Sequence, residues 1–120
     1  MLTGCFFTYT GTKGVSVSRF NPNIKKWPSY IDLAPSLSLL NDIKSNKINW
    51  DEYTFRYYKE TLSQLNPYKI YDDLKDNVIL CYEKPNQHCH RFLVRDWIYD
   101  ELGIKILEWN PNMENFKQLF

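Results

Sequence analysis

The sequence has no apolar run that approaches the roughly 20 residues needed to cross a bilayer. It also has almost no net charge, +1 at pH 7. This balance excludes the broad electrostatic attraction by which proteins bind long DNA or RNA non-specifically. We therefore expect neither a membrane nor a long nucleic acid as a partner. A small anionic ligand is still compatible with the balance, because one arginine or one helix N-terminus can hold it locally.

Cysteine is scarce as well. The three cysteines are an odd number and too few for a disulfide framework, which favours a reducing cytosol (Cys5, Cys81 and Cys89). The first residues carry no charged region, and the apolar stretch after them is too short for a signal peptide. Lysine outnumbers arginine, and Asn, Ile and Tyr are plentiful. AT-rich codons produce this bias, which suggests a low-GC bacterium or one of its phages as the source. We expect a cytoplasmic protein of a bacterium or of a phage-infected host cell.

Aromatic residues, by contrast, are abundant. Apolar residues make up 43% of the 120 residues and aromatic residues 17%, which excludes disorder from low hydrophobicity. This length fits one domain over residues 1–120. A core of that size does not need so many rings, so we expect some of them to line a pocket or a subunit interface.

The order of the predicted elements indicates a small α/β domain. The patterns favour strands at 6–10, 15–18, 78–82 and 104–109. They favour helices at 37–43, from Asn49 or Asp51 to 65, at 67–74 and at 88–102, with Gly103 as the last stop. The first two strands form a hairpin or lie beside each other, and residues 78–109 form a parallel βαβ unit. We expect a mainly parallel sheet of about four to five strands, flanked by helices.

Two segments fall outside these elements. Residues 19–35 contain three prolines and no usable period, so they form a long loop of the kind that is usually functional, and it could serve as a lid. Residues 110–120 form a short amphipathic tail. Its apolar side chains need a partner, so we expect a homo-oligomer (Met113, Phe116, Leu119 and Phe120).

The turn from Glu83 to Arg91 is the main candidate for a working surface. In open α/β sheets, ligands lie beyond the carboxyl ends of the strands, and this turn joins a buried strand to a helix. The unpaired N–H groups at the start of that helix, together with Arg91, would attract a phosphate or a carboxylate. The alternative is structural: Glu83 caps a neighbouring element and Arg91 only pairs with it.

Cys89 is a candidate nucleophile within that turn. A helix start, His90 and Arg91 all lower a thiol pKa. The spacing, however, matches neither a tyrosine-phosphatase loop nor a redox Cys-Xaa-Xaa-Cys pair, and a free cysteine is also a common core residue. His88, Cys89 and His90, with Cys81 nearby, could suggest a metal. Because neighbouring residues on a helix point in different directions, and no second ligand pair has zinc-like spacing, we expect neither a metal nor a cofactor.

The stretch from residue 80 to residue 97, LCYEKPNQHCHRFLVRDW, resembles the domain-of-unknown-function 488 family, the YeaO-like proteins. Members carry a buried strand, then Cys-Xaa-Glu-Lys, a short turn, and Cys-His-Arg opening a helix. Residues 16–19 followed by Pro22, residues 33–36 and the helix at 53–58 agree too, so the resemblance spans about 5–109. It implies a shared set of residues that would meet at one end of the sheet: Ser18, Arg19, Glu83, Cys89, His90 and Arg91.

Three functional hypotheses follow. The first is a binder of a small phosphorylated, nucleotide-like ligand, with Arg19 and Arg91 on the phosphate and rings on the base; such a protein could sequester a nucleotide signal, as phage anti-defence proteins do. Arg19 could instead be a surface residue of a mobile loop. The second is an enzyme on a similar substrate, with His90 or Glu83 as acid or base and Cys89 as nucleophile. The third is a protein-interaction module.

Overall fold

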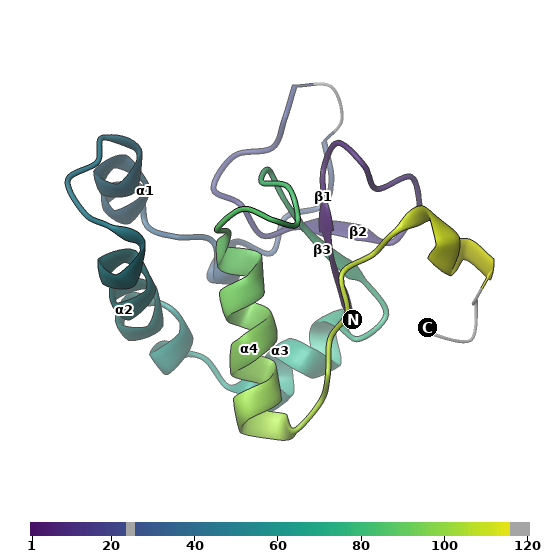
Figure 1. Ribbon diagram of the computed structural model, residues 1–120. Helices are drawn as coiled ribbons and strands as arrows, with labels where there is room; N and C mark the ends of the chain where they lie inside the picture. Colours follow the sequence, from purple (N-terminus) through teal and green to yellow (C-terminus); the bar gives the residue numbers. More distant parts are fainter. Residues whose placement is uncertain (24–25, 116–120) are drawn as a thin grey trace.

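Three short parallel strands form the sheet, and they do not pair in chain order (Figure 1). The computed structural model describes residues 1–23 and 26–115. The strands are β1 (Leu2–Cys5), β2 (Gly14–Ser16) and β3 (Val78–Cys81), in the order β1-β3-β2. Leu2 to Cys5 pair with Val78 to Cys81, and Gly14 to Ser16 pair with Val78 to Leu80. Central β3 is buried along its whole length, as its unbroken apolar run predicts.

The predicted count of four to five strands is wrong for the described residues, where the sheet has three strands and is parallel throughout. The expected strand at 6–10 is instead a turn after β1, closed by bonds from the N–H groups of Thr8 and Tyr9 to the Cys5 carbonyl. The first two strands are neither a hairpin nor neighbours, because β3 lies between them. Residues 104–109 make one parallel bridge, Glu108 to Thr3 of β1, rather than a strand beside β3.

Four α-helices lie within the described residues, and local capping explains where they begin. Ser36, Asn49 and Asn66 each accept a hydrogen bond from a backbone N–H in the first turn of the helix that follows, and Asn49 completes a capping box with Glu52. Gly103 has φ of 71°, the left-handed conformation that ends the last helix. The helices are α1 (Leu37–Lys44), α2 (Trp50–Glu60), α3 (Pro67–Leu74) and α4 (His90–Leu102).

The two faces of the sheet are covered differently. Alternate residues of a strand face opposite sides, so Ile79 packs into a cluster to which all four helices contribute, with α4 lying across the sheet (Figure 1). Val78 and Leu80 face a second cluster built from strand and loop residues, with the rings of Tyr9, Trp27 and Trp109. The helices therefore lie on one side of the sheet, and the aromatic residues after β1 cover the other.

The described residues form one α/β domain with short 3-10 turns at Ile31–Leu33, Leu62–Gln64 and Pro111–Asn115. Nowhere in residues 1–23 and 26–115 is there a helix with the length and apolarity needed to span a membrane. Met113 packs on the second cluster, on the face of the sheet opposite the helices. Phe116, Leu119 and Phe120, from which we expect contact with a second copy, lie outside the described residues.

Candidate functional site

A cavity of about 540 Å³ lies beyond the carboxyl ends of β2 and β3. Its wall is assembled from segments that are far apart in the sequence: the loop after β2, the end of α1, the start of α2, and the turn from β3 into α4. This is where ligands sit in open α/β sheets, as the sequence indicated. Five of the six residues predicted from the family resemblance line it (Ser18, Arg19, Glu83, Cys89 and His90).

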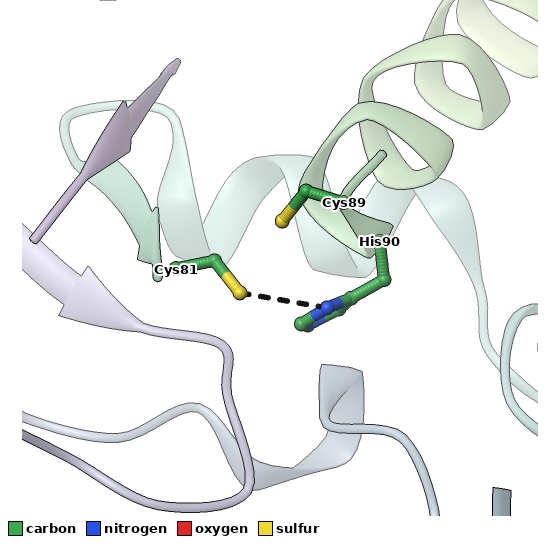
Figure 2. A group of neighbouring side chains, drawn as sticks. All are labelled: Cys81, Cys89 and His90. Carbon is green, nitrogen blue, oxygen red and sulfur yellow. Dashed lines mark hydrogen bonds between the residues drawn. The ribbon is translucent and has the colours of Figure 1, made fainter. Parts of the chain in front are cut away.

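Cys81, Cys89 and His90 form a compact cluster in the wall of this cavity (Figure 2). Their ligand-capable atoms all lie within 4.8 Å of one another. The Sγ atom of Cys81 is 3.6 Å from Nδ1 of His90 and 3.4 Å from Oε2 of Glu83. Each of the three clustered residues is at most 5% exposed. Two sulfurs and one imidazole nitrogen thus face one another in a largely buried part of the cavity wall.

The backbone at Cys89 explains why two adjacent residues converge. We predicted a helix from His88, in which neighbouring side chains would point apart. Instead Cys89 is the N-cap of α4, with extended angles φ −153° and ψ 141°, and His90 is the first helical residue. The change from extended to helical backbone turns both side chains toward Cys81, which follows Ile79 on the helix side of β3.

The imidazole of His90 is held from two directions. Its Nε2 lies 2.7 Å from the carbonyl oxygen of Val17. A carbonyl oxygen can only accept, so Nε2 carries the proton and donates it. In the neutral ring, Nδ1 is then an unprotonated acceptor that faces the two sulfurs. The ring of Tyr57 lies edge-on to His90, with 5.5 Å between centroids, and fixes its tilt.

Burial raises the pKa of the Cys89 thiol well above its usual range, and the neighbouring Cys81 thiol adds to the effect. Our prediction of a lowered pKa was wrong. It assumed that Arg91 and an accessible helix start would stabilise a thiolate, whereas Cys89 is 3% exposed and the Arg91 side chain engages Glu108. At neutral pH Cys89 is therefore a thiol in this structure.

Arg91 lies outside the cavity. Its side chain is fully buried and forms a two-point ion pair with Glu108, with Nε 3.2 Å from Oε1 and Nη2 2.9 Å from Oε2. The guanidinium also lies over the ring of Phe92. The expectation of a structural pair is therefore met with a different partner, Glu108 in place of Glu83. In this structure Arg91 is not available to a ligand in the cavity.

Arg19 has the opposite placement, at the cavity wall and partly exposed. Its Nε and Nη2 donate to the carbonyl oxygen of Pro35, at 3.0 and 2.9 Å. These bonds join the two ends of the loop from 19 to 35, so Arg19 is anchored rather than a free surface residue. A guanidinium has five N–H donors, so three remain after the two bonds to Pro35.

Aromatic rings form part of the wall, as their abundance in the sequence predicted, although the sequence did not show which rings these are. Trp50 stacks on Tyr53, with ring centroids 4.8 Å apart and an interplanar angle of 12°, and on His88, at 4.6 Å and 13°. Tyr82 and Phe20 line the cavity too, and the Tyr82 hydroxyl donates to the Phe20 carbonyl. These flat apolar surfaces suit a ring-bearing ligand.

Two further contributors were missed, Lys44 as a second cation in the wall and Glu108 as the partner of Arg91, and Cys81 was named only as a neighbour of the possible metal ligands. For Cys81, strand alternation was an available signal, because it lies two residues after Ile79 and faces the same side. For Glu108 no local pattern gives the partner, because Arg91 lies on α4 and Glu108 on the segment after it.

The fold and the site define an α/β domain with a ring-lined cavity and a buried cysteine-histidine cluster. A family model described as the active DUF488-N3 subclade, DUF488-N3a, matches residues 9–102. The chain therefore belongs to this family, and the resemblance seen in the sequence is confirmed. The matched range includes every residue of the predicted site. No curated protein and no solved structure matches the chain.

Proposed function

We propose that the cavity binds a small anionic ligand that carries an aromatic ring, of the size and chemistry of a nucleotide. The observation that carries this proposal is the composition of the cavity lining, which combines stacked rings with two cations, Arg19 and Lys44. A volume of about 540 Å³ is within the usual range of small-molecule sites, roughly 300–1,000 Å³.

Each part of such a ligand has a counterpart in the wall. The remaining N–H groups of Arg19 suit a phosphate, with Lys44 as a mobile second charge. A base would stack on the ring series that ends at His88, or on the Tyr82 side. The carboxylate of Glu83 repels an anion but accepts hydrogen bonds, so it suits a sugar hydroxyl or a base N–H group.

The first test is capture of a ligand from a defined mixture. Purified protein is incubated with mono- and dinucleotides, free ligand is removed, the protein is denatured, and released molecules are identified by mass spectrometry. Arg19→Met should weaken binding of the captured species by about 1.5–3 kcal/mol, roughly 10–150-fold in Kd. Arg95→Met, on the surface of α4 and outside this cavity, is the matched control and should leave Kd unchanged. Equal Kd values for the two variants would remove Arg19 from the site.

The fate of the ligand separates a binder from an enzyme. Recovery of an intact nucleotide would support sequestration, the role in which a small domain removes a signal without changing it. The enzyme alternative is favoured by a specific observation: the Cys81, Cys89 and His90 cluster and Glu83 lie in the same wall. A new product that disappears in Cys89→Ser, while ligand binding persists, would establish it.

A further inference from the structure

The geometry of the Cys81, Cys89 and His90 cluster matches what a tetrahedral metal requires. On one zinc ion, bonds of about 2.3 Å to sulfur and about 2.0 Å to nitrogen place these donors roughly 3.5–3.8 Å apart. Cys81 Sγ and His90 Nδ1 are 3.6 Å apart, and all three donor atoms fit within 4.8 Å (Figure 2). Little movement is therefore needed for the three atoms to share one ion.

The surroundings of His90 favour the same use. Metal-bound histidines donate their second N–H to a carbonyl or carboxylate, which fixes the tautomer and aims the other nitrogen at the metal. His90 does this through Nε2 and the Val17 carbonyl, at 2.7 Å. Nδ1 is thereby the nitrogen left for a metal, and it lies 3.6 Å from Cys81 Sγ.

The charge balance of the cluster also suits a metal. Two sulfurs lie near one imidazole nitrogen, and both thiols can lose their protons when a divalent ion binds. Two thiolates and one divalent ion sum to zero charge, so a bound Zn²⁺ would leave a neutral group in this buried place, which avoids the cost of an isolated charge. The three residues also line the cavity, so one side of the cluster faces solvent-accessible space.

We propose that Cys81, Cys89 and His90 bind one soft or borderline divalent cation of the Zn²⁺ class, with its fourth coordination position directed into the cavity. Two sulfurs and one imidazole select such ions over Mg²⁺ or Ca²⁺, and three protein ligands with an open position are typical of zinc sites that bind a water or a substrate. Glu83 lines the same cavity, with its Oε2 3.4 Å from Cys81 Sγ. The proposal does not rest on the nucleotide-like ligand.

The test uses metal ions alone as probes. Full-length protein is stripped with a chelator under a reducing agent and titrated with Co²⁺ and then with Zn²⁺. The expected result is one equivalent of Co²⁺, sulfur-to-cobalt charge-transfer absorption, the intense visible bands of four-coordinate cobalt, and loss of both when Zn²⁺ displaces it. Folded, reduced protein that binds no metal, or that shows only the weak bands of six-coordinate cobalt, would overturn the proposal.

Matched cysteine variants locate the site. Cys81→Ser and Cys89→Ser should each weaken Zn²⁺ binding by about 10–100-fold or more, since even outer-shell changes have effects of that size. Cys5→Ser is the control: Cys5 is also a buried thiol, but its sulfur donates to the Tyr82 carbonyl at 3.4 Å. Its Zn²⁺ affinity should match that of the wild type. A loss in Cys5→Ser alone would contradict the assignment.

A measurement on the unmodified protein covers the case in which a variant does not fold. X-ray absorption at the zinc edge counts the donors directly. Two sulfurs and at least one nitrogen are expected; one sulfur or none would refute the site.

Discussion

Arg91 and Glu108 form an ion pair that fastens the segment after α4 to the body of the domain. The guanidinium is fully buried, and the carboxylate, at 19% exposure, belongs to the residue that bridges to Thr3 of β1. The two hydrogen bonds, Nε to Oε1 and Nη2 to Oε2, make the contact directional. The Cys-His-Arg stretch therefore divides into two roles: Cys89 and His90 line the cavity, and Arg91 stabilises the fold.

Breaking that pair should destabilise the protein. Glu108→Gln leaves a buried guanidinium without its counter-charge, and we expect a loss of about 3–5 kcal/mol in the free energy of unfolding, measured by urea denaturation. Asp96→Asn, which removes the exposed partner of Arg95, should cost under about 1 kcal/mol. Similar losses of unfolding free energy in both variants would contradict a larger contribution from the buried pair than from the exposed one.

His88 ends the ring stack and is exposed, so it can be removed without opening the core. His88→Ala should weaken a captured ring-bearing ligand by about 1–3 kcal/mol, the range for loss of a stacking partner. Tyr68→Ala removes another exposed ring, on α3 and outside the cavity, and should have no effect. Calorimetry with the captured ligand gives both affinities, and an unaltered Kd in His88→Ala would place the ring elsewhere in the cavity.

The capping box at Asn49 sets the start of α2 and with it the position of Trp50. Its side chain accepts from the N–H of Glu52 at 2.8 Å, and the Glu52 carboxylate accepts from the N–H of Asn49. Asn49→Ala should lower the free energy of unfolding by about 1 kcal/mol, whereas Asn49→Asp keeps an acceptor and should change it little. Thermal and urea unfolding of the pair provide the comparison, and equal stability of the two variants would contradict a role for the cap.

Gly14 in β2 has no room for a side chain. A Cβ there would lie 2.6 Å from Cδ1 of Leu80 and 2.7 Å from Cε3 of Trp27. Gly14→Ala should therefore cost about 1–3 kcal/mol through overpacking. Gly103→Asn tests backbone conformation, because a Cβ added there would have no atom within 4 Å. Asparagine tolerates the left-handed region, so we expect a smaller loss of unfolding free energy than in Gly14→Ala. The reverse order of stability in urea would show that the core behind β2 can relax.

Much of the local structure was predictable because its causes lie within a few residues. Ser36, Asn49 and Asn66 cap the helices that follow them, and Gly103 ends α4. The unbroken apolar run of β3 predicted a strand buried on both faces, and the turn after it was correctly expected at a cavity. The family, too, was recognisable, because Cys-Xaa-Glu-Lys and Cys-His-Arg are contiguous motifs.

The errors concern pairing between distant segments. Aromatic and β-branched residues at 6–10 resemble a strand, but in this fold their rings cover the back of the sheet after β1 ends at Cys5. Residues 104–109 have a strand-like composition, yet only Glu108 finds a bridge partner. Strand propensity reflects how well side chains fit a half-buried surface. Both segments pack on such a surface without forming the backbone hydrogen bonds of a strand pair.

By itself, then, the sequence determined where α1, α2 and α3 begin and where α4 ends, the central strand, the family and the end of the sheet where the cavity lies. These depend on capping, periodicity and motif, which act over short separations. Only the tertiary structure decided the strand order, the partner of Arg91 and the meeting of Cys81 with Cys89 and His90. Those outcomes depend on which surfaces can be buried together and on one extended residue before α4. Such contacts join positions more than about 100 residues apart, as in the bond from the Trp109 N–H to the Thr3 carbonyl, and no local pattern encodes them.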